Sequence, residues 1–161
     1  MYFHIALHGH CPRGKGSFES AGCLPGLLAD FDAQSPFRSE NEGKAPSVES
    51  LYSLVSDFEA HYPFHLTLIE SGYGIYPSIR FREPLFLPDQ RTRNEANGLL
   101  SRFAEAFRIF GCAHGWRTTV DRLNVAGLVR LPGTYNRKGP SPLPVRLVER
   151  DGGISDAHLR H

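Results

Sequence analysis

The chain has 161 residues, of which 40% are hydrophobic and 22% are charged, and its formal net charge is +1. This length is enough for one domain with a buried core, and the composition is that of a globular protein rather than a disordered one. A charge so close to zero excludes a strongly basic chain, so any nucleic-acid-binding surface must come from local clusters of Lys and Arg.

Cysteine content and hydropathy predict the cellular location of the protein. Cys11, Cys23 and Cys112 form an odd, widely spaced set, which indicates reduced thiols rather than a disulfide framework. No apolar run approaches the length of a membrane span, and the first residues lack the basic lead of a signal peptide. We therefore expect a cytoplasmic protein with no membrane partner.

The first half of the chain predicts strands, a polar loop and one helix. Residues 2–7 and 27–32 are apolar segments of strand length, and the Gly- and Ser-rich segment 13–22 between them is expected to be a loop. Apolar residues at helical spacing predict a helix over 48–58, with Ser47 as its N-cap.

The second half predicts a hairpin, another helix and two final strands. Residues 64–69 and 75–81 are strand-like and are joined by a Gly-rich turn. A helix with a buried stripe of Leu and Phe is expected over 89–111, where a glycine would end it. Short strands are expected at 128–131 and 145–148. Strands interleaved with two helices predict an α/β or α+β fold, with helices packed on a sheet.

Two acids, Asp30 and Asp32, stand one residue apart at the end of the second predicted strand. Side chains at i and i+2 of a strand share a face, so both carboxylates point the same way and Phe31 takes the opposite face. Two like charges this close repel each other, and a bound Mg²⁺ or Mn²⁺ ion is the simplest compensation. The alternative is a solvated strand end that leads into a loop.

Two further segments are candidates for binding an anion. Ser71-Gly72-Tyr73-Gly74 is a turn whose glycines let backbone N–H groups approach a phosphate closely, although it also suits an ordinary hairpin. Arg130 precedes the turn at Pro132-Gly133, and Arg137 and Lys138 follow it. These side chains are charge-assisted donors for phosphate oxygens, unless the segment is only a solvated basic loop.

Taken in order, Leu24 to Asp32, Ser71 to Tyr76 and Leu128 to Lys138 resemble the motifs of the archaeo-eukaryotic primase superfamily, specifically its plasmid- and phage-borne primase-polymerases. The resemblance covers about residues 2–149. It implies a single primase-polymerase catalytic core over 1–161, with an RRM-like antiparallel sheet flanked by helices. It also implies template-directed nucleotidyl transfer, with two Mg²⁺ or Mn²⁺ ions as cofactors. The partners it implies are single-stranded DNA, nucleoside triphosphates and a replicative helicase.

The resemblance assigns roles to individual residues. The metal-binding catalytic acids would be Asp30, Asp32 and a later third acid, Asp121. The incoming nucleotide would be held by Ser71, Gly72, Tyr76, Arg130, Asn136 and Lys138. Apart from the resemblance, the charge and position of Arg80 and Arg137 suggest contacts with nucleic acid, as do Arg13 and Lys15 in the loop near the acids. The family motif continues to a histidine where this chain has Tyr76, which can donate a hydrogen bond but carries no positive charge.

Other functions compete with this interpretation. A catalytically silent module of the same fold would bind nucleotide or single-stranded DNA, and the missing histidine favours it. A rolling-circle initiator nuclease would use Tyr76 as nucleophile, but His8-Gly9-His10 lacks the hydrophobic residue expected between its histidines. Residues 9–16 are one residue short of a P-loop and end in glycine where Ser or Thr is needed. His8, His10 and Cys11 are zinc-ligand types, yet no second cluster accompanies them in the sequence.

Overall fold

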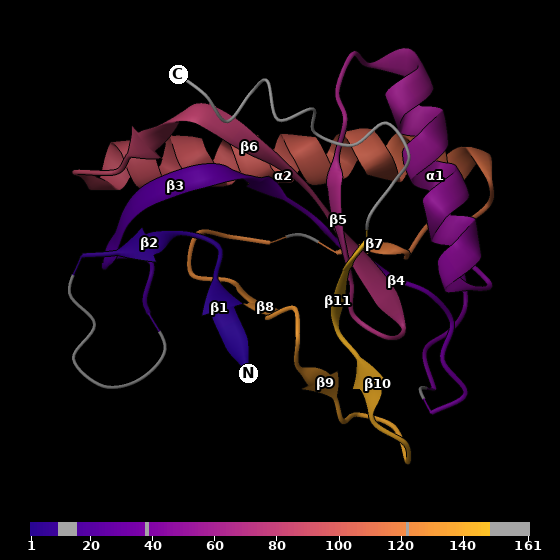
Figure 1. The fold of residues 1–161 in the computed structure, drawn as a ribbon. Coiled ribbons are helices and arrows are strands. Elements are labelled where there is room, and N and C mark those ends of the chain that lie inside the picture. The colour runs from indigo at the N-terminus through magenta and orange to yellow at the C-terminus, as the bar shows by residue number, and fades with distance from the viewer. Residues whose placement is uncertain (10–15, 38, 122, 149–161) are drawn as a thin grey trace.

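The computed structural model describes residues 1–9, 16–37, 39–121 and 123–148. It has an α+β fold in which a seven-stranded antiparallel sheet packs against two helices (Figure 1). The helices are α1 (Val48–His61) and α2 (Gln90–Ala113). The expected mixture of strands and two helices is therefore confirmed, and its sheet is antiparallel.

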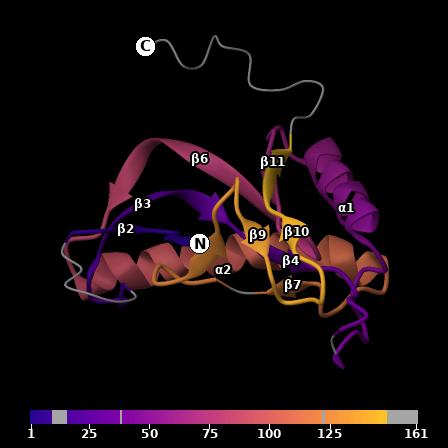
Figure 2. The same cartoon turned by 60° about the horizontal axis from the view of Figure 1, so that its bottom comes forward.

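The main sheet has the strand order β11-β5-β6-β3-β2, with β4 paired to β6 and β7 paired to β4. Its strands are β2 (Leu7–His8), β3 (Ala21–Leu28), β4 (Asp30–Asp32), β5 (Thr67–Glu70), β6 (Gly74–Phe86), β7 (Val120–Asp121) and β11 (Arg146–Val148). Two small antiparallel pairs join β1 (Tyr2–His4) to β8 (Leu128–Arg130) and β9 (Tyr135–Asn136) to β10 (Leu143–Pro144). Figures 1 and 2 show β8 and β9 on the side of the molecule where the N-terminus lies.

The long strand β6 organises the sheet because β3, β4 and β5 all pair with it. The predicted strand at 27–32 is two strands, β3 and β4, on either side of Ala29. β3 also begins at Ala21, inside the segment expected to be a loop. Its register shifts between Leu24 and Gly26, and this irregularity accommodates a Pro-Gly pair that on sequence alone indicates a turn.

Both predicted helices are confirmed, with local capping at their starts. The Ser47 side chain accepts a hydrogen bond from the Ser50 backbone N–H at the start of α1. At the start of α2, Asp89 and Thr92 cap each other's backbone N–H groups reciprocally. α2 runs through Gly111 to Ala113, so the predicted end was two residues early. Neither helix within the described ranges is long and apolar enough to cross a membrane.

The core between sheet and helices is built largely of phenylalanine. Phe58 of α1 stacks on Phe107 of α2, with ring centroids 3.9 Å apart. Phe107 also contacts Phe31 of β4 edge-on, with centroids 4.9 Å apart, and both side chains are fully buried. Because Phe31 faces the helices, its neighbours along β4 must face the opposite side of the sheet.

Candidate functional site

Three aspartates gather on the face of the sheet that is turned away from the helices. Asp30 and Asp32 flank the buried Phe31 on β4. β7 runs antiparallel beside β4, and its Asp121 is the direct partner of Asp30. The Cβ atoms of directly opposed residues lie about 4.5–5.5 Å apart. The structure therefore brings the predicted third acid to the predicted pair.

This environment strongly changes the pKa of the Asp30 carboxyl group. Burial, together with the negative charges of Asp32 and Asp121, raises the pKa of Asp30 to about 7, whereas Arg130 and Lys138 act in the opposite direction. A carboxylate shielded from water and close to two like charges holds a proton or another cation more tightly than an exposed one. Added positive charge near Asp30 would therefore stabilise this cluster.

Lys44 provides such a charge at Asp32. Its Nζ lies 3.1 Å from Oδ2 of Asp32, and the two side chains are only 12% and 15% exposed. No pattern in the sequence points to Lys44, because it lies in a polar segment with no motif and no periodicity. Only the tertiary fold returns this segment to β4, through a bridge between Ala33 and Ala45.

The aspartates offer the hard oxygen ligands that Mg²⁺ and Mn²⁺ prefer. Asp30 and Asp121 oppose each other, and Asp32 is next on the same face of β4. Over the part of the chain that the structure describes, no three His, Cys, Asp or Glu side chains are already arranged as a metal-binding group. The donor set fits a divalent cation chemically, since such an ion would offset the repulsion that raises the pKa of Asp30.

The predicted Gly-rich turn joins β5 to β6 and contacts the basic segment. Gly72 has a φ of +96°, and a Cβ atom there would lie 2.9 Å from Cβ of Leu143. The buried Ser71 accepts a 2.7 Å hydrogen bond at its carbonyl oxygen from the side-chain amide of Asn136. The side-chain oxygen of Asn136 accepts a 3.2 Å bond from the Lys138 backbone N–H. Asn136 therefore holds the turn and the basic segment together.

Tyr76 and Arg130 form a buried pair. Tyr76 is 3% exposed, and its hydroxyl oxygen accepts a 3.2 Å hydrogen bond from Nη1 of Arg130. Burial and the nearby Asp30 raise the pKa of Tyr76. The guanidinium of Arg130 also lies over the ring of Tyr2, 5.6 Å from its centroid. Tyr76 thus positions Arg130, and this burial disfavours both a direct phosphate contact and a role as nucleophile.

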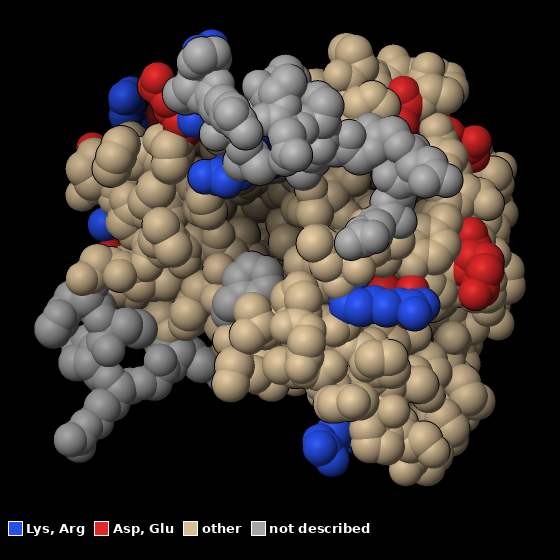
Figure 3. Space-filling view, in the orientation of Figure 1, with Lys and Arg blue, Asp and Glu red and all other residues tan. Residues whose placement is uncertain are grey.

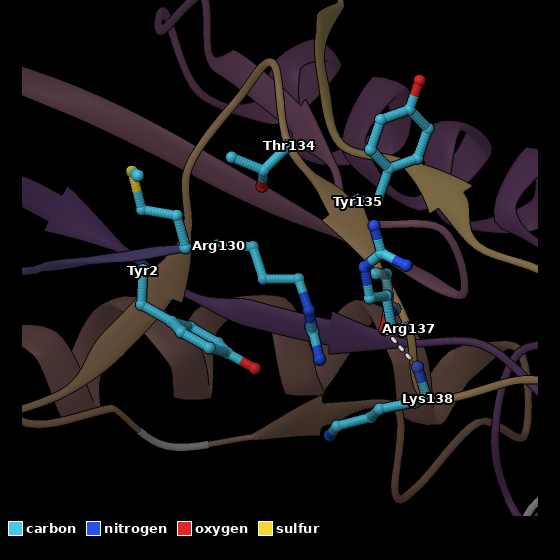
Figure 4. Close-up of a pocket in the computed structure, with 8 residues that line it drawn as sticks. Tyr2, Arg130, Thr134, Tyr135, Arg137 and Lys138 are labelled. Atoms are coloured by element: carbon cyan, nitrogen blue, oxygen red, sulfur yellow. Dashed lines mark hydrogen bonds between the residues drawn. The ribbon is translucent and has the colours of Figure 1, made fainter.

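The N-terminal residues and the segment around β8 and β9 form a pocket of about 480 Å³, and none of the three aspartates lines it. Its lining residues are Met1, Tyr2, Arg130, Thr134, Tyr135, Asn136, Arg137 and Lys138. Figure 4 shows the guanidinium of Arg130 and the amino end of Lys138 directed into the same space, while the guanidinium of Arg137 turns toward Tyr135. Arg130 and Lys138 also lower the pKa of Asp30, so pocket and acids share these two cations.

No pattern in the sequence points to the two tyrosines that line this pocket, Tyr2 and Tyr135. Tyr2 reaches it because β1 pairs with β8, which places Tyr2 directly opposite Arg130. Tyr135 is on β9 and is 57% exposed. A tyrosine inside a predicted first strand carries no signal for a pocket, since the strand that pairs with it is distant in sequence.

The remaining predicted residues lie elsewhere. Arg80 is exposed on β6, four residues after Tyr76, and does not line the pocket. Arg13 and Lys15 lie outside the described residues, as do most of the P-loop-like segment and His10 and Cys11. On the face shown in Figure 3, the basic side chains of the described residues form separate small groups rather than one stripe.

Comparison with known proteins gives no match: no protein-family model, no curated protein and no solved structure matches this chain.

Proposed function

We propose that this chain is a nucleotidyltransferase of the primase-polymerase kind, which joins nucleotides on a single-stranded DNA template with the help of Mg²⁺ or Mn²⁺. One relationship carries the proposal. Arg130 and Lys138 line the pocket and also act electrostatically on Asp30, within the cluster of three acids. In such a site the basic side chains can bind phosphates, while the clustered carboxylates can hold the cations that act at the reacting phosphate. A basic pocket beside clustered carboxylates therefore suits a reaction on a polyphosphate.

The pocket has the chemistry and size for a nucleotide. Its volume of about 480 Å³ falls in the range of roughly 300–1,000 Å³ that is typical of small-molecule sites. Arg130 and Lys138 would bind triphosphate oxygens through charge-assisted hydrogen bonds. Tyr2 and Tyr135, 55% and 57% exposed, offer aromatic surfaces on which bases can stack.

The acidic cluster would hold the divalent cations through Asp30, Asp32 and Asp121. Such ions activate the attacking hydroxyl and stabilise the leaving pyrophosphate in polymerases. The protein's own side chains would position the phosphates of the substrate. Arg130, fixed by Tyr76, orients the phosphates, and Lys138 offsets their charge next to the carboxylates.

In this proposal, nucleic acid contacts the protein only near the pocket, and its affinity is modest. Arg137 is exposed at the pocket and is available to a template phosphate. The order of the three motifs supports work in plasmid- or phage-type replication in the cytoplasm, beside a separate replicative helicase.

A second candidate is a catalytically silent module of the same fold that binds nucleotide or single-stranded DNA. The observation that favours it is the buried Tyr76 hydroxyl, which contacts Arg130 instead of replacing a phosphate-binding histidine. The cluster of Asp30, Asp32 and Asp121 opposes it, because a binding-only pocket for phosphates gains nothing from three adjacent acids.

A primer-synthesis assay distinguishes these functions. The protein would be incubated with Mn²⁺, single-stranded DNA and labelled ribo- or deoxyribonucleotides, with and without an annealed primer. We expect labelled products from the native chain and none from an Asp30→Asn, Asp121→Asn double variant that remains folded by circular dichroism. Glu95→Gln, which removes one exposed acid on α2, is the matched control and should leave incorporation unchanged.

Each outcome of the primer-synthesis assay supports or refutes a particular candidate function. Nucleotide or DNA binding without incorporation would establish the silent module. Incorporation by the folded double variant would remove the acids from the mechanism, and a failure to bind either ligand would refute both candidates.

A further inference from the structure

Phe37 is an exposed aromatic residue in the loop that follows β4. It is 54% exposed, and its ring meets the ring of Tyr73 edge-on, with centroids 6.2 Å apart. Tyr73 belongs to the Gly-rich turn, and its carbonyl oxygen accepts a 2.8 Å hydrogen bond from the Ala33 N–H, directly after β4. Phe37 is therefore attached to the end of the strand that carries Asp30 and Asp32.

The loop holds Phe37 in place through hydrogen bonds of its own side chains. The side-chain oxygen of Asn41 accepts a 2.9 Å bond from the Ser35 N–H, and its amide donates a 2.7 Å bond to the Ser35 carbonyl oxygen. The hydroxyl of the buried Ser35 accepts a 3.4 Å bond from the Phe37 N–H. Single exposed apolar residues are common on protein surfaces. A ring that is already fixed by its loop, however, loses little further freedom when a planar ligand binds to it.

Gly139 connects Phe37 with the basic segment of the pocket. A Cβ atom at Gly139 would lie 2.9 Å from the Tyr73 hydroxyl oxygen and 3.3 Å from Cδ2 of Phe37. Gly139 directly follows Arg137 and Lys138, and both of these residues line the pocket. The exposed ring therefore adjoins the segment whose side chains are suited to bind phosphates.

The charges near Phe37 favour a base at the ring rather than a phosphate. Glu40 and Glu42 are exposed on the same loop, where they repel phosphates. Arg137 and Lys138, in the segment against which the ring packs, attract them. Proteins that bind single strands combine such cations for the backbone with aromatic rings on which bases stack.

We propose that an unpaired base of single-stranded DNA stacks on Phe37, next to phosphates held by Arg137 and Lys138. The inference rests on the proposed function and names a residue that would position the template. More than half of the Phe37 surface is available for this contact. The contact should accept any base, because every base presents a π face.

Two oligonucleotides separate base stacking from phosphate binding. One is a thymidine oligonucleotide, and the other is a fully abasic oligonucleotide of the same length, which keeps the phosphates. Fluorescence anisotropy would measure the affinity of the full chain for each. We expect Phe37→Ala to weaken binding of the thymidine oligonucleotide by roughly 5- to 150-fold, the range for one stacked base, and to leave binding of the abasic one unchanged. Phe64→Ala is the matched control, since Phe64 is 42% exposed between α1 and β5, and it should change neither affinity.

A tryptophan at position 37 tests the contact without removing the ring. In a Trp116→Phe background, Phe37→Trp makes position 37 the site of the single tryptophan of the chain. The thymidine oligonucleotide should quench its fluorescence, and the abasic one should not. This measurement keeps the inference testable even if Phe37→Ala does not fold.

Equal affinities of native chain and Phe37→Ala for the thymidine oligonucleotide, equal losses for both oligonucleotides, or no quenching at position 37 would overturn the inference. A native dimer that Phe37→Ala converts to a monomer in sedimentation would also overturn it, because a second copy would then cover the ring. If the native chain binds the thymidine oligonucleotide and Phe37→Ala binds it equally well, only the role of Phe37 is wrong. If the native chain binds neither oligonucleotide, the proposed function fails together with the inference.

Discussion

Asp30 of β4 and Asp121 of β7 are direct partners across an antiparallel ladder, with their side chains on the same face of the sheet. Like charges that oppose each other in this way destabilise a sheet unless a proton or a cation is bound between them. The same pair of acids therefore affects the pH dependence of stability and the proposed binding of a metal ion.

The stability of the metal-free protein should fall as the pH rises from about 4 to about 7. The ordinary pKa of Asp is about 3.9 in an unfolded chain, whereas that of Asp30 in the folded chain is about 7. Between these values Asp30 binds more protons in the folded state than in the unfolded state, so its contribution to the free energy of unfolding decreases by up to about 1.4 kcal/mol per pH unit. Urea unfolding in EDTA across this range measures the slope.

Asp30→Asn should remove that contribution to the slope, since an amide does not titrate. Glu95→Gln is the control and should retain the native slope. An unchanged slope in Asp30→Asn would show that other groups determine the pH dependence.

Tyr76→Phe should weaken nucleotide binding through Arg130. The lost hydrogen bond joins a hydroxyl to a charged guanidinium and holds that guanidinium in place before the ligand binds. Such bonds contribute roughly 1.5–3 kcal/mol, so the loss of affinity should not exceed about 10- to 150-fold. In an Arg130→Met background the same change should have little effect, because the group that Tyr76 positions is gone. Equal effects in both backgrounds, measured by calorimetric titration with a nucleoside triphosphate, would refute the positioning role. Tyr135→Phe is the exposed control.

Substitutions of Arg137 and of Lys138 should weaken the binding of different ligands. Arg137 turns toward Tyr135 and lies at the surface, so Arg137→Met should weaken single-stranded DNA binding. The slope of log affinity against log salt should fall by about 0.7 for one lost phosphate contact. Lys138→Met should instead weaken triphosphate binding, because its amino group points into the pocket beside Asp30. Fluorescence anisotropy at several salt concentrations tests both, and identical profiles would contradict the assignment.

Gly72→Ala should destabilise the protein more than Gly133→Ala. Both glycines have positive φ, +96° and +82°, so alanine costs about 1–2 kcal/mol of backbone strain at either position. At Gly72 the new methyl group would also lie 2.9 Å from Cβ of Leu143, whereas at Gly133 no atom lies within 4 Å. Chemical denaturation of the two variants compares them, and equal losses would mean that Leu143 moves aside without cost.

Local sequence patterns determined the helices and the acid pair. α1 and α2 follow from apolar residues at helical spacing and from the caps Ser47 and Asp89, all of which depend on neighbours within one or two turns. The shared face of Asp30 and Asp32 follows equally from the two-residue period of a strand. The first part of β3, residues 21–26, was not predicted as a strand for the same reason, because Pro25 and Gly26 indicate a turn locally and only the pairing of β3 with β6 makes the segment a strand.

Tertiary structure alone decided how the site is completed. The alternation of residues along a strand predicts on which face of the sheet a side chain lies, but it does not predict which other strand pairs with that strand. The pairing of β7 with β4 therefore placed Asp121, and the pairing of β1 with β8 placed Tyr2 against Arg130. Lys44 reached Asp32 because the polar segment before α1 is bonded to the residues before β7, an attachment between distant parts of the chain that no local pattern encodes.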